Sequence, residues 1–225
     1  VYYIADFWQD FENALYAKDG YNDKGKYYTD YIDLESFADQ WLFYELNEEN
    51  SVNSSVYYYK DSDICGDGKL HASWPWDMEH SLAREGGAAS SWFAAASDLK
   101  PEGYWMQFYH HRDFAEAVYK EWMTKFVPAL EKALNPETGY DPDGISSLDW
   151  YLGYYGTDAQ INESRWNGSG FAEKLEKIRR IYTVRLDFLT EALGLYDTDY
   201  IYFYKENGIL YGVNAQKESI PVENP

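Results

Sequence analysis

The chain has 225 residues, which is long enough to bury one substantial hydrophobic core or two small ones. It carries 39 acidic against 19 basic residues, a formal net charge of −20 at pH 7. This excess of carboxylates argues against a nucleic-acid polymer or an anionic membrane surface as partner, because both attract Lys and Arg. The single cysteine excludes an internal disulfide framework, and no apolar run approaches the roughly 20 residues of a membrane span.

The first third of the chain predicts two helices followed by a β-hairpin. Apolar residues recur at helical spacing over residues 1–17, which indicates an amphipathic helix. Asp33 is a suitable N-cap for a second helix. The apolar face expected for that helix comprises Phe37, Trp41, Leu42 and Leu46. Residues 56–60 and 69–74 have the composition of strands, and the connector between them favours a hairpin turn over a calcium loop because no glutamate ends it.

Two carboxylates follow the second predicted strand, within residues 69–80. Pro75 fixes its own φ and holds its predecessor extended, so the Pro-Trp-Asp turn is stiff. If the backbone beyond the turn is extended, Asp77 and Glu79 point to the same side. Two such carboxylates repel unless a proton or a cation lies between them, and their oxygen atoms suit Mg²⁺ or Ca²⁺. We therefore predict a divalent-metal site there, lined by Trp76 and His80.

Other aromatic and histidine side chains have two interpretations each. The tryptophans near the predicted metal site are Trp74, Trp76 and Trp92. They suit stacking on a nucleobase or a sugar, although packing of the turn is the favoured interpretation. His110 and His111 are adjacent and so face different ways on a helix, which favours a solvated pair over a metal site.

The remainder of the chain is predicted to be mostly helical. The expected helices cover residues 113–125, 127–134, 147–155, 158–166 and 171–193. Pro128 is expected to break or kink the helical run around it. Two β runs at 200–204 and 209–213 predict a hairpin, after which the last residues are expected to form a linker. The sequence thus predicts a mainly α fold with a small β-hairpin.

Five phrases, taken in order, resemble one family. They are YIDLESF at 31–37, EL at 45–46, SVYYYKD at 55–61, GKL at 68–70 and PWDME at 75–79. Their order and spacing resemble the CotH (spore coat protein H) kinase family, and matching five ordered phrases is far more specific than matching one. The resemblance implies an atypical kinase with a protein-kinase-like C-lobe that uses ATP and a divalent metal. Residues 1–196 are expected to be the C-terminal part of that domain, with its N-lobe before residue 1. Residues 197–225 are expected to form a hairpin and linker tail.

The resemblance also assigns roles to residues. Asp77 matches the metal-holding aspartate that corresponds to the DFG aspartate of ordinary kinases. Family members carry a catalytic aspartate in the loop before the third phrase, and here Asn50 lies nearest that position with Glu49 beside it. An amide accepts no proton at neutral pH, so Glu49 serves as base only if its longer side chain reaches the same place. An active kinase and a catalytically silent relative both remain open.

Three functions follow as hypotheses. The first is a kinase that transfers phosphate from ATP to protein Ser or Thr. The second is a silent CotH-like structural or interaction module, of the kind found in cellulosome scaffolds. The third is a carbohydrate-binding module, which the 20% aromatic content supports. The acidity, the low lysine content and the resemblance together suit a secreted, extracellular bacterial protein with flanking modules and a protein substrate or partner.

Overall fold

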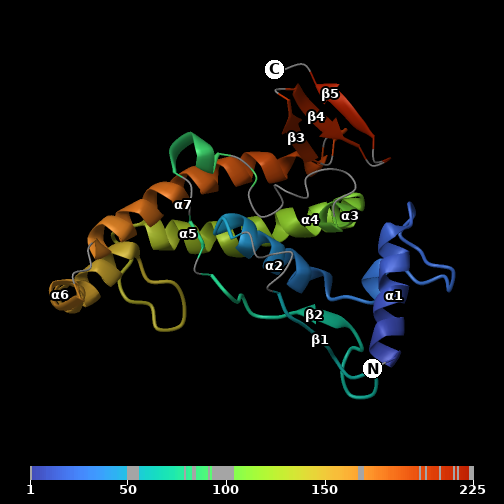
Figure 1. Cartoon of the computed structure of the whole chain (residues 1–225), viewed down its shortest axis with the longest axis horizontal. Helices are drawn as coiled ribbons and strands as arrows, with labels where there is room; N and C mark the ends of the chain where they lie inside the picture. Colours follow the sequence, from blue (N-terminus) through green and yellow to red (C-terminus); the bar gives the residue numbers. More distant parts are fainter. Residues whose placement is uncertain are drawn as a thin grey trace. The chain divides into compact units, whose positions relative to one another are not determined.

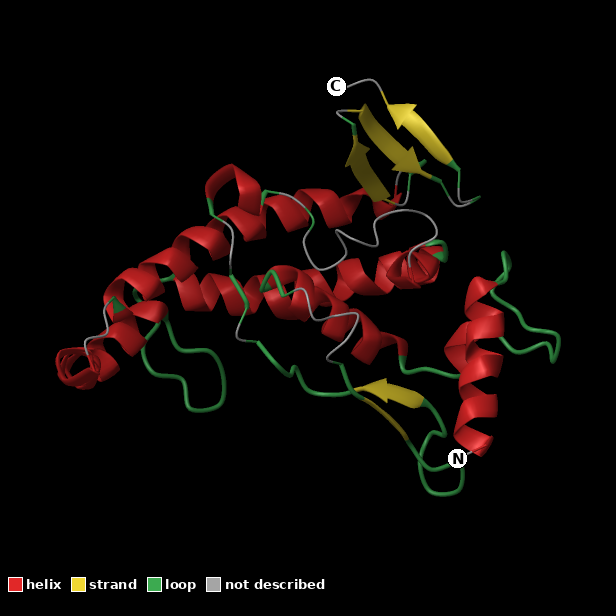
Figure 2. Cartoon of the chain, viewed as in Figure 1, coloured by secondary structure: helices red, strands yellow, loops and turns green. Residues whose placement is uncertain are grey.

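The computed structural model describes residues 2–49, 56–78, 80–82, 85–90, 92, 104–166, 170–197, 199–200, 202–207, 209–214, 216 and 218–222. The fold is mainly helical, with few and short strands, as the sequence predicts (Figures 1 and 2). The chain divides into two compact units. Unit 1 comprises Val1–Ser81, Trp92–Glu121 and Glu191–Pro225, and unit 2 comprises Leu82–Ser91 and Trp122–Thr190. Among the described residues, no helix is both long and apolar enough to cross a membrane.

Unit 1 contains α1 (Tyr2–Tyr16), the 3₁₀ turn η1 (Tyr28–Asp30), α2 (Leu34–Leu46), α3 (Tyr104–Tyr109), α4 (Arg112–Glu121) and the 3₁₀ turn η5 (Leu195–Asp197). Helices α1, α2 and α4 begin near where the sequence places them, whereas α3 and the two 3₁₀ turns were not predicted. Asp33 caps α2 as predicted, since its Oδ1 accepts a hydrogen bond of 2.8 Å from the Ser36 N–H. Helix α2 packs chiefly against α4, and α3 packs against both α1 and α4.

An aromatic core joins these helices. Phe108 of α3 lies at its centre, with ring centroids 5.0 to 6.4 Å from those of Phe11, Tyr28, Phe37, Trp105 and Phe114. The predicted apolar face of α2 is buried throughout. Burial of each such side chain contributes about 1.5 to 3 kcal/mol, so this cluster is a major source of stability for unit 1.

The predicted hairpin consists of β1 (Tyr58–Lys60) and β2 (Leu70–Ala72), paired antiparallel with Tyr59 opposite His71. Both strands are shorter than the runs predicted from sequence. The hairpin is bonded to the chain that enters α2, because Leu70 N donates to Tyr31 O and Leu70 O accepts from Asp33 N, each at 2.8 Å. Figure 1 shows β2 beside the start of α2.

The C-terminal part of unit 1 is a three-stranded antiparallel sheet, β3 (Tyr202–Glu206), β4 (Ile209–Val213) and β5 (Ser219–Val222). The predicted hairpin is confirmed, but the predicted linker is wrong where β5 forms. Asn214 explains the third strand, since its Oδ1 accepts hydrogen bonds from the Gln216 and Glu218 N–H groups and closes a turn. Pro221 is tolerated because β5 is an edge strand. The division predicted at residue 196 stays a prediction.

Unit 2 contains the 3₁₀ turn η3 (Gly86–Ala89), the π-helix η4 (Trp122–Phe126), α5 (Val127–Leu134), α6 (Leu148–Trp166) and residues 171–190 of α7 (Phe171–Gly194). Pro128 lies in the first turn of α5, where its missing N–H costs little, and the irregularity predicted there is the preceding π-helix. The two short helices predicted within 147–166 are one continuous helix, because Gly156 lowers helix propensity without ending the helix.

Candidate functional site

The structure describes four of the six predicted site residues. Glu49, Trp76, Asp77 and His80 lie within the described residues. Asn50 and Glu79 lie outside the described residues, so their parts in the site stay predictions.

Tyr44, near the end of α2, holds the Pro-Trp-Asp turn in place. The Trp76 N–H donates to Tyr44 Oη at 3.3 Å, and Tyr44 Oη donates to Trp76 O at 3.2 Å. Tyr44 is completely buried. Burial raises the pKa of the Tyr44 phenol, and the nearby carboxylates of Glu49 and Asp77 raise that pKa as well because they repel a phenolate. The Tyr44 hydroxyl therefore interacts electrostatically with both candidate site residues, Glu49 and Asp77.

Glu49 is bonded to the segment that follows the turn. Its side chain is buried, and its Oε2 accepts a hydrogen bond of 3.1 Å from Ser81 Oγ. Its N–H donates to Tyr44 O at 3.0 Å, five residues back, and this bond closes the C-terminal end of α2. Residues 44–49 and 76–81 therefore lie together, although the sequence separates them by about 30 positions.

The backbone has a positive φ at both sides of this junction. Glu48 has φ = 54° and Asp77 has φ = 64°, in the left-handed region that residues other than glycine rarely adopt. At Glu48 this conformation ends α2 in an ordinary way, because the Glu48 N–H donates to Glu45 O and the Glu49 N–H donates to Tyr44 O. Asp77 follows no helix, and its conformation costs on the order of 1–3 kcal/mol. The conformation of Asp77 also corrects one expectation. The backbone at Asp77 is not extended, so strand alternation does not decide whether Asp77 and Glu79 point the same way.

The end of α2 is strongly acidic. Glu45, Glu48 and Glu49 are all completely buried, whereas Asp77 is exposed. The C-terminal end of a helix carries partial negative charge from its last carbonyl groups. Three buried carboxyl groups therefore lie at the negative end of the α2 dipole.

The tryptophans near the turn are not packed as the favoured interpretation required. Trp74 is 87% exposed and Trp76 is 58% exposed. The Trp76 ring contacts Tyr57 edge to face, at 6.0 Å between centroids. Trp92 does pack, since its ring lies 5.8 Å from that of Trp41. His80 is exposed, which leaves its ring open to solvent beside the turn.

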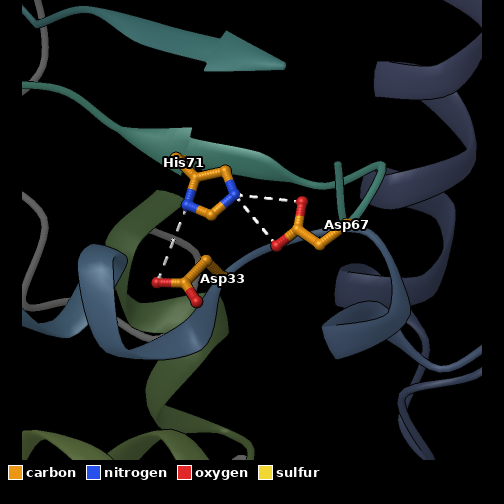
Figure 3. A group of neighbouring side chains, drawn as sticks. All are labelled: Asp33, Asp67 and His71. Atoms are coloured by element: carbon orange, nitrogen blue, oxygen red, sulfur yellow. Dashed lines mark hydrogen bonds and ion pairs between the residues drawn. The ribbon is translucent and has the colours of Figure 1, made fainter. Parts of the chain in front are cut away.

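A second group of polar side chains, which the sequence did not predict, joins the hairpin to α2 (Figure 3). His71 Nε2 lies 3.1 and 3.0 Å from the two carboxylate oxygens of Asp67, and His71 Nδ1 lies 4.0 Å from Asp33 Oδ1. The Lys69 N–H, followed by the His71 ring, lowers the pKa of Asp67. These three residues meet because β2 pairs with β1 and also bonds to the chain before α2. The sequence offered one signal for this group, which is the series of aspartates in the loop between the two strands.

This group is a poor metal site as it stands. One ligand atom of each residue lies within 4.8 Å of the other two, but Figure 3 shows the two carboxylates on opposite nitrogens of the imidazole ring, so both ring nitrogens already face a partner. Asp33 Oδ1 is also the cap of α2, and Asp67 Oδ1 accepts a hydrogen bond from the Lys69 N–H. The geometry is that of a histidine ring held between two carboxylates.

The adjacent histidines are buried, so the predicted solvated pair is wrong. His111 Nε2 lies 2.8 Å from Leu15 O, and the ring stacks on Tyr28 at 4.6 Å. The reason is tertiary, because α1 covers the start of α4 and supplies the carbonyl. These histidines belong to the core of unit 1.

Comparisons with protein-family models, with curated proteins and with solved structures found no significant match. The resemblance to the CotH kinase family therefore rests on the five sequence phrases. The structure adds the junction of residues 44–49 with residues 76–81, which the phrases alone do not specify.

Proposed function

We propose that this chain is part of a CotH-like atypical kinase that transfers phosphate from ATP to Ser or Thr hydroxyls of a protein. One observation carries the proposal: hydrogen bonds join residues 44–49 to residues 76–81, the two segments that hold the candidate base Glu49 and the candidate metal ligand Asp77. The positive φ of Asp77 supports it, because the fold holds that residue in a costly conformation.

Each residue has a role in this proposal. Asp77, together with Glu79, would hold Mg²⁺, which when bound neutralises negative charge on the phosphates. Glu49 accepts the proton of the acceptor hydroxyl. Its Oε2 already accepts a hydrogen bond from Ser81 Oγ at 3.1 Å, which lies within the range that a general base needs. Trp76 and His80, which lie in the same segment as Asp77, are exposed to solvent.

The burial of Glu49 favours a second candidate function, a catalytically silent interaction module. Its side chain is completely buried, so a substrate hydroxyl reaches Oε2 only if the Ser81 segment moves aside. A silent module of this kind needs no such movement. The two functions therefore differ in one measurable property, which is transfer of phosphate that depends on Glu49.

The test uses the full-length natural protein with radiolabelled ATP, Mg²⁺ and a panel of Ser- and Thr-containing proteins. Asp77→Asn and Glu49→Gln are compared with Asp143→Asn and Glu116→Gln, which make the same chemical changes at exposed positions. A kinase loses phosphate transfer in the first pair and retains it in the second. Binding of ATP without transfer in the unmodified protein supports the silent module. Equal transfer in all variants, or neither binding nor transfer, overturns both.

A further inference from the structure

The β1–β2 hairpin has one face that packs and one that does not. Tyr58 points inward, where its ring lies 5.2 Å from Phe37 and 5.5 Å from Trp8. Alternation along the strand then places Tyr57 and Tyr59 on the opposite face. They are 56% and 55% exposed, which agrees with that placement.

The outward rings form an ordered array, here named the aromatic face and made of Tyr57, Tyr59, His71 and Trp76. Tyr59 stacks on His71, its partner across the two strands, with centroids 4.9 Å apart and planes 8° apart. Tyr57 meets Trp76 edge to face at 6.0 Å. Exposed aromatic groups gathered in this way mark interaction surfaces, and rings already held in position lose little entropy on binding.

The polar group of Figure 3 fixes one end of this array. Asp67 and Asp33 hold the His71 ring from its two nitrogens, and His71 in turn supports the Tyr59 ring. Both carboxylates remain partly exposed. The aromatic face therefore ends in hydrogen-bond acceptors that are open to solvent.

The charges around the aromatic face decide what kind of ligand it fits. Both lysines of the two strands and their turn have partners elsewhere: Lys60 Nζ lies 2.7 Å from Asp63 Oδ1, and Lys69 Nζ donates to Thr29 O at 2.9 Å. Acceptors at the face repel phosphate, nucleic acid and anionic lipid, and a purely apolar ligand would leave those acceptors desolvated. A second copy of a chain with net charge −20 is disfavoured in the same way.

A complementary ligand combines apolar C–H faces, which stack on aromatic rings, with many hydroxyl donors and no negative charge. We infer that the aromatic face binds a neutral glycan chain. Tyr57 directly precedes β1 and Tyr59 lies in it, so their Cα atoms are about 6.6 Å apart in an extended backbone. An extended run of sugar units reaches both rings, whereas a single sugar covers only one. This surface shares Trp76 with the proposed phosphotransfer site, but the binding of glycan does not depend on phosphate transfer.

The experiment is affinity electrophoresis of the full chain in native gels that contain hydroxyethylcellulose, xylan or galactomannan. We expect retardation by at least one of these polysaccharides. Tyr59→Ala and Trp76→Ala are each expected to weaken that binding by about 5-fold or more, from the loss of one aromatic contact. Trp166→Ala is the matched control, because Trp166 is 70% exposed on α6 in unit 2. Circular dichroism of each variant checks that the fold is intact.

Three outcomes overturn the inference. They are no retardation by any of the three polysaccharides, equal retardation of the unmodified chain and the Tyr59→Ala variant, and loss of binding in Trp166→Ala alone. A polylysine gel serves as a further probe: because the chain carries a net charge of −20, only retardation by polylysine that Tyr59→Ala abolishes would assign the face to a basic peptide instead. Phosphate transfer is measured separately on the same preparations, so failure of the kinase proposal does not change the interpretation of the gels.

Discussion

Tyr44→Phe is the substitution that most directly perturbs the junction between α2 and the Pro-Trp-Asp turn. It keeps the ring and removes only the hydroxyl, so no cavity forms in the core. The hydroxyl makes two hydrogen bonds with Trp76, one from its N–H at 3.3 Å and one to its carbonyl oxygen at 3.2 Å. Without Tyr44 Oη, both backbone groups of Trp76 lose this partner.

The magnitude follows from those two bonds. Each hydrogen bond contributes about 0.5 to 1.5 kcal/mol net, so the free energy of unfolding is expected to fall by about 1 to 3 kcal/mol. In a chain of this length, each kcal/mol lowers the melting temperature by about 2 to 4 °C. Because the hydroxyl also positions the turn that carries Asp77, divalent-metal binding is expected to weaken along with stability.

The assay is urea unfolding followed by circular dichroism, with Tyr140→Phe as the control. Tyr140 is an exposed tyrosine in unit 2, and loss of its hydroxyl is expected to change stability by less than about 0.5 kcal/mol. Equal stability of Tyr44→Phe and the unmodified chain would refute the claim that Tyr44 fastens the turn to α2. If Tyr44→Phe lowers stability but leaves metal binding unchanged, then Tyr44 stabilises the turn without contributing to the metal site.

Three other predictions concern residues around the fold. Asp33→Ala removes the cap of α2 and is expected to cost about 1 kcal/mol, most of which Asp33→Ser should restore; equal unfolding midpoints in urea would contradict this. Arg185→Met is expected to destabilise unit 2 by about 3 kcal/mol, because Arg185 is completely buried and its Nη1 donates to Ala89 O at 3.0 Å; a thermal melt that matches the unmodified chain would exclude this role. The pKa of Asp67 is lower in the folded chain than its ordinary value near 3.8, so Asp67 stabilises the fold above about pH 4 and loses that contribution as pH falls through its folded-state pKa. Asp67→Asn is therefore expected to make stability less pH-dependent between about pH 2 and 4, as acid titrations of both proteins will measure.

Much of the fold follows from local patterns in the sequence. The cap at Asp33, the buried face of α2 and the β1–β2 hairpin are confirmed, because each depends on residues close together in the chain. The predictions that are wrong concern features that depend on contacts the local sequence pattern does not show. The histidines at the start of α4 are buried by α1, and no pattern around them indicates that cover. Strand β5 depends on one side-chain turn at Asn214, which periodicity does not detect.

The candidate site likewise contains some residues that the sequence predicts and others that only the structure identifies. Asp77 and Glu49 were selected by resemblance and by residue chemistry, which single-sequence reasoning supplies well. Tyr44, which links them, is one of 24 tyrosines; it directly precedes the EL phrase, but that phrase does not indicate that the Tyr44 hydroxyl reaches Trp76. The group of Asp33, Asp67 and His71 depends on a strand register that pairs Tyr59 with His71, and a shift of one residue would turn His71 to the other face.

The most direct test of the account is the binding of Mn²⁺, as a spectroscopic substitute for Mg²⁺, followed by electron paramagnetic resonance. The unmodified full-length protein is expected to bind the ion, Asp77→Asn to lose at least about 10-fold in affinity, and Asp143→Asn to match the unmodified protein. Equal Mn²⁺ affinity in all three proteins would contradict the claim that the end of α2 and the turn at Asp77 together form a metal-dependent site.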